Sequence, residues 1–197
     1  MAEKGRLAHL CVDVQNMFAS GTDWQTPWLN RMLPAIEALV ERDPAATVFT
    51  RFIPPASPGD EIGTWKDYYE RWPTMTRSRL EPHMIEVVPT LARFMPPARH
   101  FNKNRYSPWL FGNLHATLKA DGVDTVLISG GETDVCVLAT VLGAIDLGYR
   151  TILASDAVFG SANQTHDAAL TVVHSRFGQQ LTVRTTQDLL DTWETLV

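Results

Sequence analysis

The feature that most constrains the fold is an alternation of short apolar runs with stretches of helical spacing. Strands are predicted at residues 7–12, 46–52, 98–101, 125–129, 151–154 and 181–184. Their nearly continuous apolar character is typical of parallel strands that are covered on both faces. Strands alternating with helices favour a parallel sheet with helices on both of its faces.

Proline and glycine mark the expected helix ends. Thr26-Pro27 and Ser107-Pro108 each resemble an N-cap followed by proline at the first helical position. The second of these helices is expected to run to Gly122. Further helices are expected over residues 64–72, 134–147 and 165–177 and at the C-terminus, with Pro89 breaking helical structure over 84–94. We predict a three-layer α-β-α, Rossmann-like fold with a mostly parallel six-stranded sheet, as a single domain over residues 1–197.

Composition excludes several functional classes. The net charge of −5 gives no basic footprint, so nucleic acid is not an expected partner. We find neither a signal peptide nor a stretch long enough to span a membrane, so no membrane partner is expected. Two cysteines do not make a disulfide framework. These features favour a cytoplasmic, reducing location.

Three polar residues fall where strands are expected to end. Asp13 closes the first strand, Lys103 follows the third, and Cys136 follows the fourth at the start of a helix. Ligands of open parallel sheets bind outside the carboxyl ends of the strands. We therefore expect these three side chains to meet at one edge.

The three residue types can work together. Only the thiolate of a cysteine is a strong nucleophile, and a helix N-terminus and a nearby lysine both favour it. A carboxylate can accept the thiol proton and later return it to a leaving amine. Gly130 and Gly131 would permit a sharp turn that aims amide N–H groups at a developing oxyanion. Taken singly, Asp13 is as easily a turn residue, Lys103 a solvated charge and Cys136 core packing.

In combination, the motifs resemble those of the isochorismatase-like cysteine hydrolase superfamily. This superfamily includes nicotinamidases, N-carbamoylsarcosine amidases and ureidoacrylate or biuret amidohydrolases. The resemblance rests on Asp13-Val14-Gln15-Asn16 with Phe18, on Lys103 with Tyr106-Ser107, on residues 130–137, and on Ala139-Thr140, Ala144, Gly148-Tyr149 and Asp156-Ala157.

The resemblance implies a role for each residue. Cys136 would attack the carbonyl of a small amide or ureide, Asp13 would take its proton, and Lys103 would support the thiolate. A cis peptide bond would join Gly131 and Glu132, and the backbone N–H groups of Glu132 and Cys136 would form the oxyanion hole. An amine would leave, and water would hydrolyse the thioester. Relatives are commonly dimers or tetramers, so a homodimer or homotetramer is expected.

Two departures from the family pattern affect this interpretation. Nicotinamidases hold a metal with an aspartate and two histidines after the second strand, but residues 50–55 contain no histidine. The six histidines show no metal-binding spacing, so we predict neither a metal nor another cofactor. Glu132 stands where relatives commonly have a small apolar residue; its side chain would contact substrate, pair with an arginine or lie on the surface.

Several further residues are candidates for the pocket. Predicted substrate contacts are Phe18, Phe52, Trp65, Tyr106, Trp109 and Val137. The stripe formed by Trp65, Tyr68, Tyr69 and Trp72 fits either the pocket or packing in the core or a subunit interface.

Five other side chains receive structural interpretations first. Arg51 and Arg105 are expected in ion pairs, with binding of a substrate carboxylate as the alternative. Cys11 is expected as buried packing rather than a redox partner of Cys136. His166 and His174 are expected on a helix remote from the strand ends, without a function.

Two other functions stay open. An ether-cleaving hydrolase of this fold would use Asp13 and Lys103 without covalent catalysis. A non-catalytic protein would keep the pocket as a binding scaffold, because a fold does not by itself prove activity.

Overall fold

The computed structural model describes residues 5–196. Its six strands form one sheet in the order β3-β2-β1-β4-β5-β6, and every pairing between neighbours is parallel. The strands are β1 (Arg6–Val12), β2 (Thr47–Phe52), β3 (Arg99–Lys103), β4 (Val123–Gly131), β5 (Arg150–Phe159) and β6 (Leu181–Arg184). The predicted α/β class with a parallel six-stranded sheet is confirmed.

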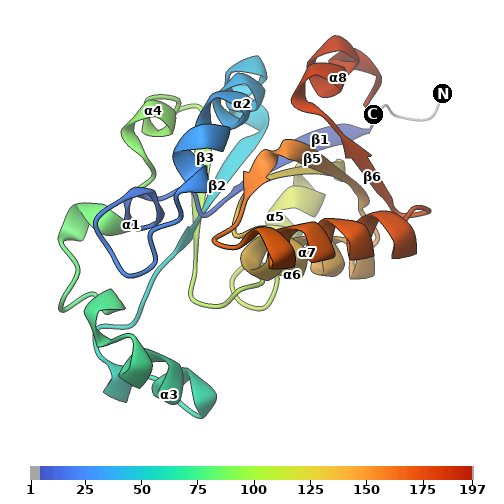
Figure 1. Cartoon of the computed structure of the whole chain (residues 1–197). Coiled ribbons are helices and arrows are strands. Elements are labelled where there is room, and N and C mark those ends of the chain that lie inside the picture. The colour runs from blue at the N-terminus through green and yellow to red at the C-terminus, as the bar shows by residue number, and fades with distance from the viewer. Residues whose placement is uncertain (1–4, 197) are drawn as a thin grey trace.

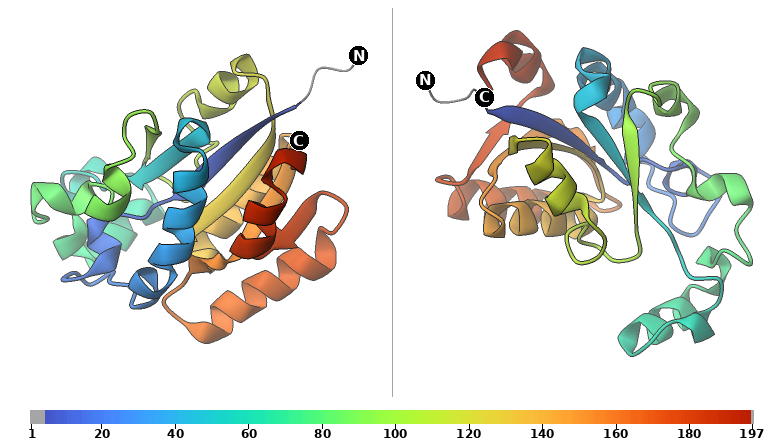
Figure 2. Two further views of the ribbon diagram at one scale, coloured as in Figure 1. Left: turned by 90° about the horizontal axis from the view of Figure 1, so that it is seen from above. Right: turned by 180° about the vertical axis from the view of Figure 1, so that it is seen from behind.

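Helices cover both faces of the sheet (Figures 1 and 2). The α-helices are α1 (Asn16–Ala19), α2 (Trp28–Arg42), α3 (Thr64–Arg71), α4 (Pro89–Ala92), α5 (Leu114–Ala120), α6 (Leu138–Asp146), α7 (Asn163–Arg176) and α8 (Thr186–Asp191). Helices α2 and α8 lie on one face, and α5, α6 and α7 lie on the other (Figure 1). Helix α3 stands away from the sheet, beyond the carboxyl end of β2 (Figure 1).

The core consists of two apolar layers, one on each face of the sheet. Leu29, Ile36 and Leu39 of α2 pack in one layer, and Leu118 of α5 and Val141 of α6 pack in the other. Alternate residues of β1 enter different layers: Cys11 joins the first, whereas Leu10 and Val12 join the second. This double burial explains why the strands are apolar on both sides.

The two proline-based predictions of helix starts were inaccurate. Helix α2 begins at Trp28 with Pro27 as its N-cap residue, and the Thr26 hydroxyl donates to the Trp24 carbonyl instead of capping. Ser107 starts no helix: its hydroxyl accepts the N–H of Trp109 in a local turn, and α5 begins only at Leu114. Such side-chain hydrogen bonds to nearby backbone compete with helix formation.

Three other segments differ from the expected pattern. Pro89 begins α4 instead of interrupting a helix, as its fixed φ permits in a first turn. The expected helix over 134–147 is divided into a π-helical turn, Thr133–Val137, followed by α6. Strand β5 continues past residue 154 to Phe159, with an irregularity in its pairing to β4.

None of the helices within residues 5–196 is long and apolar enough to cross a membrane.

Candidate active site

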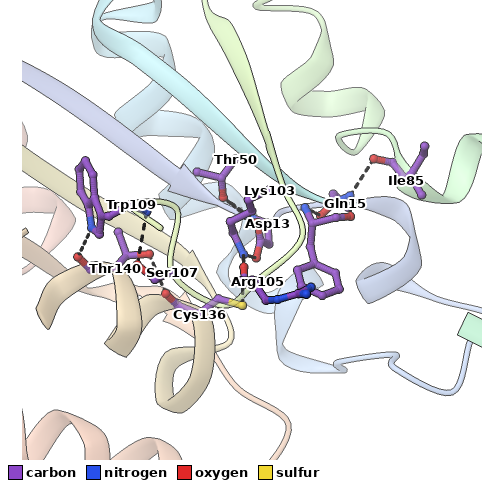
Figure 3. Close-up of polar contacts among 11 residues, drawn as sticks. Asp13, Gln15, Thr50, Ile85, Lys103, Arg105, Ser107, Trp109, Cys136 and Thr140 are labelled. Atoms are coloured by element: carbon purple, nitrogen blue, oxygen red, sulfur yellow. Dashed lines mark hydrogen bonds and ion pairs between the residues drawn. The ribbon is translucent and has the colours of Figure 1, made fainter. Parts of the chain in front are cut away.

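Three side chains from separate strand ends meet at the carboxyl edge of the sheet (Figure 3). Asp13 follows β1, Lys103 is the last residue of β3, and Cys136 lies in the turn after β4. Lys103 Nζ lies 2.7 Å from Asp13 Oδ2 and 3.4 Å from Cys136 Sγ. All three are buried, with exposures of 1%, 6% and 7% for Asp13, Lys103 and Cys136. The arrangement flanks the point between β1 and β4 where the strand order reverses, which is a common ligand site in such sheets.

Asp13 is held by the neighbouring strand β2. Its φ of 50° lies in the left-handed region, which aspartate tolerates better than most residues. Its backbone N–H donates to the carbonyl of Thr50 at 3.1 Å, and the Thr50 hydroxyl donates to Asp13 Oδ1 at 2.6 Å. One carboxylate oxygen is therefore occupied by Thr50, and the other faces Lys103.

Lys103 has an acceptor for each of its three ammonium hydrogens. Besides Asp13 and Cys136, its Nζ donates to the carbonyl of Arg105 at 3.0 Å. Burial lowers the pKa of Lys103, but the attraction of Asp13 and Cys136 outweighs it and the net shift is upward. The lysine is thus a buried cation with all its donors engaged.

The Arg105 carbonyl is positioned by the Arg105 side chain. The guanidinium binds the Glu61 carboxylate through both Nη atoms, at 3.2 and 2.8 Å, and lies 4.7 Å from the centre of the Trp65 ring. This bidentate geometry ties the segment before α3 to the loop after β3.

Cys136 lies in the π-helical turn that begins after a cis peptide bond between Gly131 and Glu132. The Glu132 carbonyl accepts N–H groups on either side of Cys136, from Val135 at 3.1 Å and Val137 at 3.0 Å. Gly130 is required just before this turn: its φ is +104°, and a Cβ there would lie 2.1 Å from the Val12 carbonyl oxygen. The turn therefore sits tightly against β1.

Opposing effects act on the pKa of the Cys136 thiol. Burial raises the pKa of Cys136, Lys103 opposes the shift, and the charge of Asp13 and its hydrogen bonding to the thiol add to it. The net shift of this pKa is upward, which favours the protonated thiol at rest. A nucleophilic attack by this sulfur would therefore need a base to remove the thiol proton, and the Asp13 carboxylate interacts with the thiol.

A small cavity of about 70 Å³ opens beside the sulfur. Its walls are largely aromatic and apolar: Phe18, Trp24, Phe52, Tyr68, Tyr106 and Val135. Glu132 and Cys136 complete the lining. A larger cavity of about 660 Å³ reaches Lys103 from the loops after β2 and β3, but its lining does not include Cys136. We therefore take the smaller cavity as the substrate pocket.

Sequence reasoning identified part of this lining. Phe18, Phe52 and Tyr106 were expected there, and Tyr68 belongs to the predicted aromatic stripe. Trp24 was missed because it lies in the irregular segment between α1 and α2, where no periodic pattern marks it. Its ring lies 6.2 Å from that of Phe18 and 5.8 Å from that of Tyr68, at the centre of the aromatic cluster.

Three expected substrate contacts lie outside the lining of this pocket. Trp109 donates its indole N–H to the Thr140 carbonyl and stacks on Tyr149, so it packs against α6 and is not part of the pocket lining. Val137 is 1% exposed and packs in the core layer beneath α6. Trp65 packs between Arg105 and Tyr106 and supports the wall. We do not retain these three as substrate contacts.

Two side chains near the cysteine turn have partners that the sequence did not reveal. Glu132 is only partly exposed, and its Oε2 accepts the N–H of Ser161 at 2.9 Å. His166 is not remote from the site: its Nδ1 lies 2.8 Å from the Thr133 hydroxyl, and its ring packs on Trp28. Helix α7 therefore supports the turn that carries the cysteine.

The remaining candidates have structural roles. Arg51 and Arg105 form ion pairs, with Glu86 and Glu61. Cys11 and Cys136 are both free thiols; Cys11 is fully buried, and burial raises its pKa to about 12. Within the part of the chain that the structure describes, no three His, Cys, Asp or Glu side chains are grouped to hold a metal ion. Independence from metal stays a prediction.

The comparisons with known proteins agree on one family. The isochorismatase domain model matches residues 7–185. Maleamate amidohydrolase from Pseudomonas putida is 32% identical over 81 residues, which cover 41% of this chain and 38% of that protein. The chain thus spans less than half the length of the first curated relatives it matches, 46% and 38%.

Solved structures show the same fold over nearly the whole chain. A cysteine hydrolase from Pseudomonas syringae pv. phaseolicola superposes with a TM-score of 0.83 at 21% identity, with 100% of each chain covered. N-carbamoylsarcosine amidase from Thermoplasma acidophilum gives a TM-score of 0.74 at 22% identity, covering 92% of this chain and 96% of that one. With the domain match over residues 7–185, these findings establish that the chain belongs to the isochorismatase family of hydrolases.

Proposed function

We propose that this protein hydrolyses a C–N bond of a small amide or ureide through a covalent thioester on Cys136. The observation that carries the proposal is the position of Lys103, whose ammonium group contacts both the Asp13 carboxylate and the Cys136 sulfur beside a small pocket. The proposed nucleophile and the proposed base thus both contact the same cation. The names of two similar proteins, an amidohydrolase and an amidase, agree with this chemistry.

The first half of the reaction forms the thioester. Asp13 takes the thiol proton as Sγ of Cys136 attacks the substrate carbonyl. The backbone N–H groups of Glu132 and Cys136 donate to the developing oxyanion. Asp13 then returns the proton to the leaving nitrogen, the C–N bond breaks, and ammonia or an amine departs.

The second half reverses these roles. Asp13 takes a proton from water, and the resulting hydroxide attacks the thioester carbonyl. The C–S bond breaks, the sulfur recovers a proton from Asp13, and the carboxylic acid product leaves. The thiol and the carboxylate return to their starting states, so one water is consumed per bond cleaved.

Lys103 makes the proton transfer feasible in a buried site. Before transfer the triad consists of a carboxylate, an ammonium and a neutral thiol, so its net charge is zero. After transfer it consists of a neutral acid, an ammonium and a thiolate, again with a net charge of zero. Because isolated buried charges are costly, a transfer within this neutral cluster is much cheaper than ionisation of the thiol to solvent.

The proposal is tested by ammonia release from a panel of small primary amides and ureides. Rapid acid quench followed by intact mass spectrometry is expected to show the acyl mass on the wild-type protein. Cys136→Ala is expected to abolish ammonia release and the adduct. The same panel with and without EDTA tests independence from metal. Turnover retained by Cys136→Ala would reject the covalent mechanism and favour hydrolysis by Asp13 and Lys103 alone.

A further inference from the structure

The walls of the substrate pocket form a cage of aromatic rings. Its members are Phe18, Trp24, Phe52, Tyr68 and Tyr106. The Trp24 ring is the centre of the cage, with ring centres of Phe52 and Tyr68 at 6.0 and 5.8 Å. The face of an aromatic ring carries negative electrostatic potential, so a cage of this kind attracts a cation.

The pocket also contains a negatively charged side chain, that of Glu132, whose charge has the same sign as the potential at the faces of the aromatic rings. Among the described residues that line it, Glu132 has the one charged side chain. Its Oε2 accepts the N–H of Ser161, the one hydrogen bond to this carboxylate among residues 5–196. Burial raises the pKa of Tyr68, another lining residue, and the charges of Tyr106, Cys136 and Glu132 add to this shift in decreasing order. The Glu132 carboxylate thus interacts electrostatically with another residue of the pocket lining.

The cations nearest the pocket are already neutralised. Lys103 uses its three hydrogens on Asp13, Cys136 and the Arg105 carbonyl. Arg105 binds Glu61, and its pair is 15% and 8% exposed. Arg51 is paired with Glu86. A substrate carboxylate would therefore enter an aromatic site next to Glu132 with no cation in the described lining to receive it, at a high desolvation cost.

The size of the pocket limits the ligand. A water molecule needs about 10–15 Å³ of cavity volume on this measure, so 70 Å³ has room for about five small heavy atoms. An amide group with one short substituent fills such a space.

We propose that the substrate is a small amide whose acyl part carries a positive charge, held between the aromatic cage and Glu132, and that amides with a carboxylate are rejected. The inference rests on the proposed amide hydrolysis for its reaction, but not for its binding preference. Glu132 is thereby a specificity-determining residue through its side chain, independently of its backbone N–H.

Binding is measured on Cys136→Ala, which lacks the proposed nucleophile, by isothermal titration calorimetry at pH 7. Three probes of similar size are compared: glycinamide, which is cationic, propanamide, its neutral isostere, and oxamate, which is anionic. Glycinamide is expected to bind about tenfold more tightly than propanamide, and oxamate most weakly. Equal affinity for the first two probes, or tightest binding of oxamate, would overturn the proposal.

Two further substitutions, each added to Cys136→Ala, test whether the preference for glycinamide over propanamide depends on Glu132. Glu132→Gln keeps an acceptor for the Ser161 N–H but removes the charge, and is expected to reduce the preference for glycinamide over propanamide severalfold. Asp146→Asn removes an equal charge from the exposed end of α6 and is expected to leave the preference unchanged. Equal effects of both substitutions would trace the preference to net charge and reject the role of Glu132.

The two proposals fail separately. Tight glycinamide binding to Cys136→Ala, with no ammonia release by the wild-type protein from any amide, would support the cation site and reject the hydrolase. Cys136-dependent release of ammonia from propanamide, without a binding preference for glycinamide, would support the hydrolase and reject the cation site.

Discussion

The Thr50 hydroxyl donates a 2.6 Å hydrogen bond to Oδ1 of Asp13 and so determines which oxygen of that carboxylate is available as a base. Oδ2, the second oxygen, lies 2.7 Å from Lys103 Nζ. In the proposed mechanism Oδ2 is therefore the atom that takes the thiol proton. Strand β2 contributes to the chemistry in this way although it supplies none of the three reacting side chains.

We expect Thr50→Val to lower kcat by about tenfold or more with little change in KM. Hydrogen bonds to charged groups are worth about 1.5–3 kcal/mol, and the isosteric substitution removes one from the base without altering the pocket. Thr50→Ser keeps the hydroxyl and should retain most of the activity. Steady-state kinetics of the three proteins test this, and an unchanged kcat in Thr50→Val would contradict the assigned role.

Alkylation of Cys136 by iodoacetamide should show no plateau near neutral pH. Burial raises the pKa of this thiol, so the rate should still be rising at pH 9. Because Lys103 lowers that pKa and Asp13 raises it, Lys103→Met should slow alkylation and Asp13→Asn should accelerate it. Peptide mass spectrometry gives the rates, with fully buried Cys11 as an internal reference. A rate that levels off below pH 7 would contradict the assignment.

Stability should fall in acid because of His9. Burial lowers the pKa of His9 from 6.5 to about 3. Between these values the unfolded chain binds a proton that the folded protein excludes, so stability is full above pH 6.5 and is lost as the pH falls toward 3. Each pKa unit corresponds to about 1.4 kcal/mol, so the loss amounts to a few kcal/mol.

Urea unfolding from pH 7 to pH 4 measures this loss. His9→Gln should flatten the dependence, since it removes the titrating group. His83→Gln, at an exposed position, should leave the slope as in the wild-type protein. A slope that is the same in all three proteins would assign the acid sensitivity to other groups.

His166→Leu should lower kcat about tenfold without a large change in KM. The substitution removes the partner of the buried Thr133 hydroxyl at the start of the cysteine turn, which loosens the backbone that positions Cys136. The matched control is His174→Leu, at an exposed position on the same helix, which should behave as wild type. Loss of activity in both variants would indicate a general effect of α7 rather than this hydrogen bond.

The meeting of Asp13, Lys103 and Cys136 was predictable because each of them lies at or just after the end of a strand. The apolar runs locate the strands, and the parallel topology then brings Asp13, Lys103 and Cys136 to one edge. Local chemistry also predicted the ends of α5 and α6, where Gly122 and Gly148 adopt φ of 75° and 81°.

The rest depended on tertiary contacts. Ser107-Pro108 fits the pattern of a helix start, but tertiary hydrogen bonds hold this segment in another conformation. The Arg105 carbonyl accepts from Lys103, and the Trp109 indole donates to the Thr140 carbonyl. The raised pKa of Cys136 follows from its burial, which a helix N-terminus and a lysine in the sequence do not reveal. Trp24 reaches the site from a loop and His166 from a later helix, and no sequence motif predicts either position.

The pairing of β1 with β4 has a consequence for biosynthesis. Residues 6–12 of β1 pair with residues 123–130 of β4, so the central ladder cannot close until most of the chain has been made. Such non-local pairing slows folding, and chains emerge from the ribosome N-terminal part first. A nascent chain that ends before β4 contains Asp13 and Lys103 but lacks both the sulfur of Cys136 and the strand that encloses the site. In the proposed mechanism Cys136 therefore meets its base and its cation only after β4 has been made and has paired with β1.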